Sequence, residues 1–323
     1  MSVLSLDYCL PFAFGLDHPE GVAWGLDGFV YAGGEAGQFY RVGLDGQVMQ
    51  IATTDGFILG LALDADSAIY ACVVGKPAVV RVAPNGTVTP YSLGTPQRPM
   101  VSPNYPVFDR AGNLYVSDSG QWEKNNGAVF RVRPDGVTEL WNTVVTNFPN
   151  GMALAPKEDA LYIACSTPKP SVVRLPITAD GSAGTPETVI ELPEAVPDGL
   201  AFDSVGDLYI ACYAPNRIYR FSSTSRLDVL IEDWENTIIA GPANIAFCGA
   251  DHTTMVISSL SRWHLTRVEL GVRGCHCTTP TSATIFRRAR IGNTYAPYFA
   301  SHPRLPRVRR MDVTRHARCC AGK

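Results

Sequence analysis

The chain has 323 residues, of which 46% are hydrophobic and 18% are charged, and its formal net charge is −3. That charge offers no electrostatic attraction to a nucleic acid or an anionic membrane, and the lack of an apolar run of about 18 residues predicts no membrane-spanning segment. The 29 glycines and 24 prolines favour short strands joined by tight turns over long helices.

The N-terminus and the cysteines indicate the cellular compartment. The first residues contain no basic region followed by an apolar core, so they do not resemble a signal peptide. Of the five cysteines in residues 1–273, four lie in or beside apolar runs, where a free thiol behaves as a small hydrophobic group. We therefore expect a cytoplasmic protein without a disulfide framework.

One motif recurs six times, and its fifth copy reads Pro-Asp-Gly-Leu-Ala-Phe (197–202). One position of each copy, called here the motif position, follows the previous one after 39 to 48 residues. A period of this length predicts a repeat architecture in which each copy forms one supersecondary unit. The six motif positions hold Glu20, Leu59, Asn104, Asn150, Asp198 and Asn244.

Each copy predicts four short strands. In the fifth copy, these are an apolar strand at 199–202, a second at 207–212, a third at 218–221 and a fourth at 227–231. Turns such as Asp45-Gly46 separate the third and fourth strands and are typical of hairpins. An Arg recurs in every third strand. We interpret it as an outward-facing residue whose stem covers apolar neighbours, and not as part of a ring of cations.

Six units of four antiparallel strands predict an all-β fold, a six-bladed β-propeller with four-stranded blades around a central channel. Blade six shows three clear strands, at 243–248, 254–259 and 263–270, and no fourth strand in its own copy. We expect residues 3–8 to supply that strand and to close the ring. A closed ring protects the sheet edges from pairing with other chains.

The first strand of each blade lines the channel of a propeller, so the motif positions should converge near its mouth. Five of the six carry a carboxylate or an amide, and burial of such groups is costly unless they are paired or bind an ion. Oxygen donors without His or Cys suit one hard divalent cation, with Ca²⁺ favoured and Mg²⁺, Mn²⁺ or Zn²⁺ as alternatives. A hydrogen-bonded ladder of amides around a water-filled pore is the competing interpretation.

The motif copies, and residues 103–118 (Pro-Asn-Tyr-Pro-Val-Phe-Asp-Arg-Ala-Gly-Asn-Leu-Tyr-Val-Ser-Asp) in particular, resemble the regucalcin-like senescence marker protein/gluconolactonase family. The likeness extends over about residues 15–270 and includes all six copies. It implies a propeller that hydrolyses a small-molecule lactone or ester with a divalent metal ion. The family's ligands, a Glu, an Asn and an Asp, match Glu20, Asn150 and Asp198.

This resemblance implies roles for the remaining motif positions. Asp198 is the residue that we expect to act as general base, or as nucleophile in a phosphotriesterase-like enzyme. Asn104 is expected to contact the substrate or to lie beside the metal. Leu59 is expected to form an apolar wall, and Asn244 to shape the pocket.

Two residues outside the motif positions are further candidates for substrate binding. Asp118 ends a strand directly before the long loop 119–127, which could reach over the channel mouth. Arg98 lies in the loop before Asn104 and could pair with an anionic group of the substrate, although a solvated surface Arg fits the sequence equally well.

Other functions stay open at this point. A phosphotriesterase-like hydrolase would use the same metal site, whereas a propeller that only binds a partner would not need the carboxylates and amides. A strictosidine-synthase-like protein would need no metal, so activity that survives a chelator would favour it. Neither the identity of the substrate nor the oligomeric state follows from the sequence.

The C-terminal part of the chain is chemically different from the rest. Residues 274–323 contain nine Arg and one Lys but a single acidic residue, so they carry +9, whereas residues 1–273 carry −12. The sequence thus predicts a catalytic propeller domain at 1–273 and an irregular or disordered basic tail at 274–323. A zinc site built on Cys275-His276-Cys277 and Cys319-Cys320 has the wrong ligand spacing, and a nucleic-acid-binding arm lacks a supporting pattern.

The start of this tail suggests an origin for its composition. Bacterial members of the family that this chain resembles, where they end a blade with Arg-Trp-His-Leu-Thr-Arg-x-x-Leu-Gly-Val-x-Gly, often continue with Leu-Pro-Leu-His-Tyr-Pro. Codons for that run, read one base late, translate as Cys-His-Cys-Thr-Thr-Pro, the residues found at 275–280. We interpret the tail as an out-of-frame translation, which sequencing of the gene would test.

Overall fold

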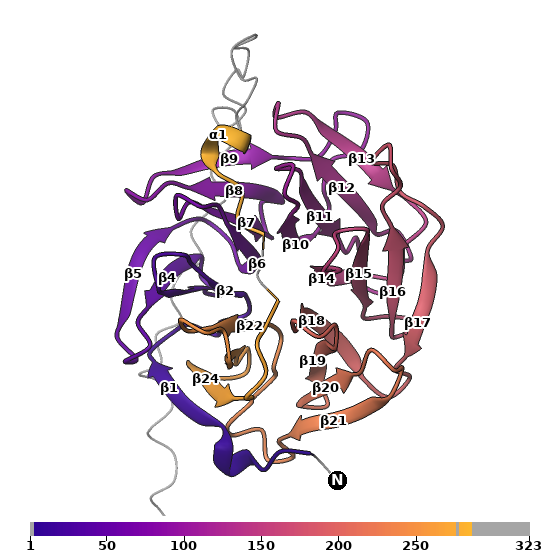
Figure 1. The fold of residues 1–323 in the computed structure, drawn as a ribbon. Coiled ribbons are helices and arrows are strands. Elements are labelled where there is room, and N and C mark those ends of the chain that lie inside the picture. Colours follow the sequence, from indigo (N-terminus) through magenta and orange to yellow (C-terminus); the bar gives the residue numbers. More distant parts are fainter. Residues whose placement is uncertain (1–2, 276–277, 286–323) are drawn as a thin grey trace, which may run out of the picture. The chain divides into compact units, whose positions relative to one another are not determined.

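The computed structural model describes residues 3–275 and 278–285. In this part of the chain, twenty-four strands form six four-stranded antiparallel sheets, and the sheets surround a centre like the blades of a propeller (Figure 1). The only helical elements among these residues are the 3-10 helix η1 (Leu6–Tyr8) and the helix α1 (Ser282–Ile285). The predicted all-β, six-bladed propeller is therefore confirmed.

The first three blades follow one another along the chain, each with its strands in sequence order. Blade one consists of β2 (Val22–Trp24), β3 (Val30–Gly33), β4 (Gln38–Val42) and β5 (Val48–Thr53). Blade two consists of β6 (Ile58–Leu63), β7 (Ile69–Val73), β8 (Ala78–Val82) and β9 (Val88–Ser92). Blade three consists of β10 (Pro103–Phe108), β11 (Leu114–Asp118), β12 (Ala128–Val132) and β13 (Thr138–Asn142).

Blades four and five repeat this order, and blade six combines the two ends of the ring. Blade four consists of β14 (Pro149–Leu154), β15 (Ala160–Cys165), β16 (Ser171–Pro176) and β17 (Glu187–Glu191). Blade five consists of β18 (Val196–Phe202), β19 (Leu208–Ala214), β20 (Arg217–Phe221) and β21 (Leu227–Glu232). Blade six consists of β22 (Ile245–Cys248), β23 (Thr254–Ser258), β24 (His264–Glu269) and β1 (Leu10–Phe14).

The N-terminus closes the ring, but with a different segment from the one predicted. The strand β1 pairs with β24, so residues 10–14 form the fourth strand of blade six, and the prediction that residues 3–8 do so is wrong. The Ser5 side chain caps η1 by accepting a hydrogen bond from the Asp7 amide, so the chain turns where a strand was expected. The amide groups of Val3 and Leu4 instead donate to carbonyls of β21 in blade five, each at 2.9 Å.

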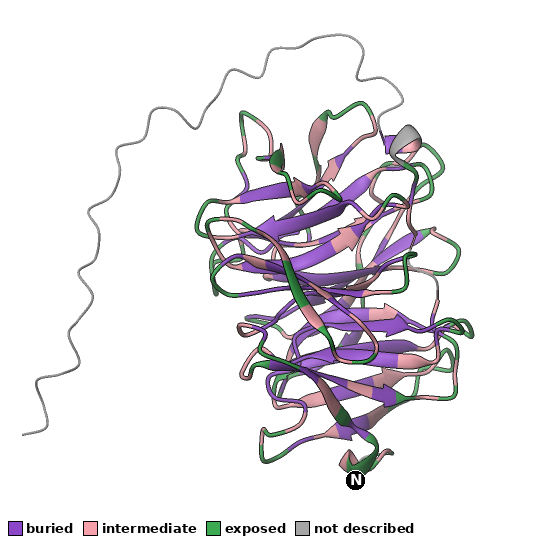
Figure 2. Ribbon diagram, turned by 90° about the vertical axis from the view of Figure 1, so that its left-hand side faces the viewer, coloured by how far each residue is buried: buried purple, intermediate pink, exposed green. Residues whose placement is uncertain are grey.

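The core lies between neighbouring blades, where the repeated aromatic residues meet. Buried segments of the strands face one another across the blades, and the turns at their ends carry most of the exposed residues (Figure 2). The second-strand Tyr of one blade packs edge-on against a Phe among the last two residues of the first strand of the next. The three pairs, with ring centroids 4.9, 4.9 and 5.4 Å apart, are Tyr70–Phe108, Tyr162–Phe202 and Tyr209–Phe247.

The third-strand Arg of blade one, Arg41, belongs to a polar cluster within its own blade. Arg41 lies over the ring of Phe29, 3.4 Å from its centroid, which agrees with the expected covering role. Arg41 also forms an ion pair of 2.9 Å with Asp27, and Asp27 accepts a hydrogen bond from the hydroxyl of Tyr31. Arg41 therefore also pairs with the turn carboxylate of its blade, a role that the sequence pattern did not indicate.

The described residues after 273 run along one face of the propeller. The Cys275 amide donates to the Phe202 carbonyl at 2.8 Å, and the Pro280 carbonyl accepts from the Ala65 amide at 2.9 Å. Ile285 is almost completely buried against blades two and three. These contacts involve residues at or beside the turns that follow the first strands, so they lie at the opposite end of those strands from the motif positions.

Several predictions about the C-terminal segment fall outside this description. Residues 276–277 and 286–323, with most of the weighed zinc ligands, lie outside the described residues. The boundary after 273, the irregular tail and its out-of-frame origin therefore stay predictions. In the part of the chain that the structure covers, no helix is long enough to cross a bilayer, and the cytoplasmic location also stays a prediction.

Candidate metal centre

The structure brings the six motif positions together at the start of the first strands. These strands, β2, β6, β10, β14, β18 and β22, lie nearest the centre of the ring (Figure 1). All six side chains are buried, although five are polar, and Asn244 has no exposed surface. This is the arrangement expected from the repeat.

Glycines after the motif positions allow the first strands to approach one another closely. A Cβ on Gly21 would lie 2.1 Å from the Leu59 carbonyl oxygen, and one on Gly151 would lie 2.3 Å from that of Asp198. A Cβ on Gly199 would lie 2.4 Å from the side-chain oxygen of Asn244. Because any larger residue would push neighbouring blades apart, these glycines keep the motif positions in one small space.

Within this space, several buried polar atoms lack a hydrogen-bond partner among the described residues. They are the Oδ1 atoms of Asn104, Asn150, Asp198 and Asn244, together with the Nδ2 atom of Asn244. Leaving such an atom buried and unpaired costs about 1–3 kcal/mol. Four unpaired oxygens around one centre fit a cation that prefers oxygen ligands, and a ladder of mutually bonded amides is not what these residues form.

The two carboxyl groups of the centre influence each other. Burial raises the pKa of Asp198 to about 8. Burial, and then the negative charge of Asp198, raise the pKa of Glu20 well above its usual range. A positive ion between the two groups would favour their charged forms, so the electrostatics also fit a cation.

Asp118, predicted to contact the substrate, is instead engaged by the protein backbone. Its carboxylate has no exposed surface and accepts hydrogen bonds from the amides of Val101, Ser102 and Gly120, at 3.0, 2.6 and 3.2 Å. These bonds fix the loop that leads into β10 and so position Asn104. Asp118 thus anchors this loop, and its contact with the substrate stays a prediction.

Arg98 lies in the same loop and keeps part of its side chain exposed. Its Nη2 atom donates to the Asn126 carbonyl at 2.6 Å and lies 3.7 Å from the Asp118 carboxylate. The guanidinium thus joins the loop before β10 to the loop 119–127. Because 29% of the side chain is accessible, a contact with an anionic group of the substrate stays a prediction.

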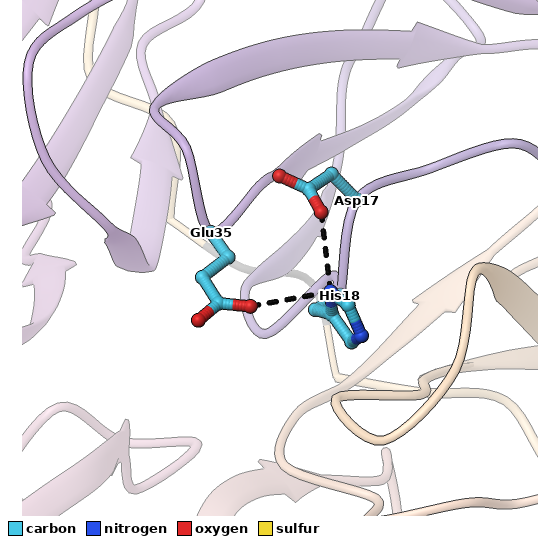
Figure 3. Close-up of side chains that lie close together, drawn as sticks. All are labelled: Asp17, His18 and Glu35. Carbon is cyan, nitrogen blue, oxygen red and sulfur yellow. Dashed lines mark hydrogen bonds and ion pairs between the residues drawn. The ribbon is translucent and has the colours of Figure 1, made fainter. Parts of the chain in front are cut away.

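The loop between β1 and β2 and the turn between β3 and β4 together carry a cluster, Asp17, His18 and Glu35, that the sequence analysis did not predict (Figure 3). The Nδ1 atom of His18 lies 3.1 Å from Asp17 and 3.2 Å from Glu35, and the His18 ring packs 5.2 Å from that of Trp263. The only available signal was the position of Asp17-His18 directly before Pro19-Glu20. These side chains are partly exposed and bond to one another, so they lack the unpaired buried atoms that distinguish the central site.

Comparison with known proteins identifies the family of the chain. The SMP-30/Gluconolactonase/LRE-like region matches residues 19–261 of the chain. A gluconolactonase of Zymomonas mobilis is 28% identical in an alignment of 193 residues that covers 50% of this chain and 51% of that protein. The chain thus aligns with only about half the length of this relative.

Two solved structures share the fold. A gluconolactonase from Xanthomonas campestris superposes with a TM-score of 0.70 at 21% identity, covering 81% of this chain and 89% of the other. A calcium-binding regucalcin from Agrobacterium tumefaciens superposes with a TM-score of 0.66 at 15% identity, covering 84% and 95%. At these identities the superpositions demonstrate the propeller alone, whereas the family match covers most of the sequence. The chain belongs to the SMP-30/Gluconolactonase/LRE-like family.

Proposed function

We propose that this protein is a divalent-cation-dependent hydrolase that opens a small lactone, with a sugar lactone of the gluconolactone type as the first candidate substrate. The observation that carries the proposal is the group of buried, unpaired oxygens of Asn104, Asn150 and Asp198 in a space shared with Glu20. The gluconolactonase relative supplies the substrate class.

In this proposal Glu20, Asn150 and Asp198 hold the cation, and Asn104 lies beside it or contacts the substrate. Ca²⁺ is the first candidate because every donor is an oxygen and a protein of the same fold is described as calcium-binding, with Mg²⁺, Mn²⁺ and Zn²⁺ as alternatives. When bound, the cation would polarise the lactone carbonyl and stabilise the negative charge that develops on its oxygen.

Asp198 acts in this proposal as the general base. Its carboxylate takes a proton from the water whose oxygen attacks the carbonyl carbon, and the proton then passes to the ring oxygen as the ring C–O bond breaks. Asn104 would donate from its amide nitrogen to the substrate and hold it against the site. Leu59 would offer an apolar surface to the carbon skeleton.

A metal-replacement assay tests the proposal. Protein stripped by a chelator should lose lactone hydrolysis, and one of Ca²⁺, Mg²⁺, Mn²⁺ or Zn²⁺ should restore it. Simple esters and a phosphotriester assayed in parallel distinguish the lactonase from an esterase or a phosphotriesterase-like enzyme.

Asp198→Asn should lower kcat by about 10²- to 10⁴-fold, the usual contribution of a positioned base. Asp251→Asn, in an exposed turn at the other end of the first strands, is the matched control and should retain wild-type activity. Lactone hydrolysis that continues in excess chelator, or full activity of the Asp198 variant, would refute the proposal.

A further inference from the structure

Ser166 directly follows β15 and is almost fully buried behind the centre. Its Oγ atom makes two hydrogen bonds, one with the side-chain nitrogen of Asn150 at 3.1 Å and one with the carbonyl oxygen of Pro197 at 2.7 Å. Pro197 directly precedes Asp198 in the chain. One hydroxyl therefore touches the side chain of one proposed ligand and the backbone next to another.

The number of protons at Ser166 decides how the Asn150 amide is oriented. A hydroxyl has a single proton, and a carbonyl oxygen can only accept, so this proton must be donated to Pro197. Toward Asn150, the Ser166 oxygen can then only accept, and the group that faces it must be the amide NH₂. The Asn150 oxygen consequently points away from Ser166, and it is one of the buried, unpaired oxygens of the centre.

We propose that Ser166 is a positioning residue that holds the Asn150 amide with its oxygen toward the cation. This inference rests on the proposed function, because it needs a cation at the centre. Without the hydroxyl, the NH₂ group of Asn150 would lose its acceptor, and the amide could rotate by half a turn. The NH₂ group, which carries partial positive charge, would then replace an oxygen ligand.

The neighbouring blade offers a matched control. Ser119 occupies the equivalent place after β11, is fully buried, and donates to the Pro149 carbonyl at 2.9 Å, directly before Asn150. It therefore makes the same bond between blades. Among the described residues, however, Ser119 has no hydrogen bond to the side chain of a motif position. Loss of the bond between blades can thus be separated from loss of the amide orientation.

The test measures Ca²⁺ binding directly, by calorimetric titration of the full chain after treatment with a chelator. Ser166→Ala should raise the Kd by about 10- to 100-fold, the range found when a residue that orients a metal ligand is removed. Ser119→Ala should leave the Kd within about 2-fold of the wild-type value, since it does not touch a ligand. Ser166→Thr, which keeps the hydroxyl, should restore binding.

Thermal unfolding gives a second readout. In chelator, both alanine variants should lose stability, and Ser166→Ala should lose more, because it loses the bond with Asn150 as well as the bond to a proline carbonyl. On addition of Ca²⁺, Ser119→Ala should gain as much in Tm as the wild type, and Ser166→Ala should gain less. If Ser166→Ala does not fold, Ser166→Cys preserves the volume, weakens both bonds, and should show the same loss of affinity in smaller degree.

A double variant checks that Ser166 acts through Asn150. In an Asn150→Ala background, Ser166→Ala should cause no further loss of Ca²⁺ affinity. If Ser166→Ala binds Ca²⁺ as tightly as Ser119→Ala does while the wild type binds normally, the inference is wrong and the proposed function stands. A wild-type protein that binds none of the four cations would overturn both.

Discussion

Among single residues, Glu20 and Asp198 are unusual because both carboxyl groups are buried and both have a raised pKa. A protein that only binds a partner gains nothing from two carboxyl groups whose pKa values are raised by burial. Their charged forms become favourable when a cation lies between them. The raised pKa values of this pair therefore support the proposed cation site.

The raised pKa of Asp198 has a measurable effect on the metal-free protein. The pKa rises from its usual 3.8 to about 8 in the folded state, so the folded protein holds this proton more tightly than the unfolded chain. Its contribution to stability is complete below about pH 4 and is lost as the pH rises through about 8. We expect the Tm in excess chelator to fall between pH 5 and pH 8, and the fall to be smaller in Asp198→Asn.

Calorimetric scans across this range check the expectation. Saturating Ca²⁺ should reduce the pH dependence of the wild type, because the cation replaces the proton at the carboxyl groups. If the wild type and Asp198→Asn have the same slope of Tm against pH in chelator, Asp198 is not the titrating group.

Among structural elements, the loop before β10 depends on a side chain from another strand. The carboxylate of Asp118, at the end of β11, accepts hydrogen bonds from three backbone amides, and two of these amides belong to this loop. Asp118→Asn would turn an NH₂ group toward amide donors, and we expect a loss of about 3 kcal/mol in the free energy of unfolding. KM should rise as well, since Asn104 follows the loop.

Denaturant unfolding and steady-state kinetics measure the two effects. Asp45→Asn is the matched control, because either residue suits the first position of its Asp45-Gly46 hairpin turn. A direct substrate contact would behave differently: if Asp118→Asn raises KM and leaves the unfolding free energy unchanged, the anchoring role is wrong and the original substrate-contact prediction is right.

For the whole molecule, closure of the ring depends on β1, the only strand of blade six that comes from the N-terminus. Removal of residues 1–14 would leave the outer edge of β24 unpaired and expose apolar surface around Ala13. A loss of about 4 kcal/mol would lower the Tm by about 6 °C in a chain of this size. We also expect the truncated protein to self-associate through the open edge.

A shorter truncation supplies the control. Removal of residues 1–5 deletes the bonds of Val3 and Leu4 to β21 but preserves β1, so its Tm should fall by less. Thermal unfolding and light scattering after size-exclusion chromatography measure both changes. Equal Tm values for the two truncations would contradict a closing role for β1.

Much of the propeller could be predicted from local patterns. Turn residues such as Asp45-Gly46, and strands at constant spacing, act within one blade, and six copies of such a unit form a ring. The closing strand was misplaced because residues 3–8 are as apolar as a strand requires, and the cap at Ser5 became evident only in three dimensions. The covering role of the third-strand Arg was predicted and agrees with Arg41 over Phe29, but the ion pair of Arg41 with Asp27 was not.

The identity of the side chains at the six motif positions follows from the repeat in the sequence, because a repeat brings equivalent positions to equivalent places around the ring. Which polar atoms there have hydrogen-bond partners depends on contacts between blades and became evident only in three dimensions. The bonds of Asp118 to Val101 and of Ser166 to Pro197 join segments that are distant along the chain, and no local pattern encodes such bonds. For the same reason, the orientation of the Asn150 amide depends on Ser166 and on a carbonyl of the next blade, and it could be derived only after the blades had been placed side by side.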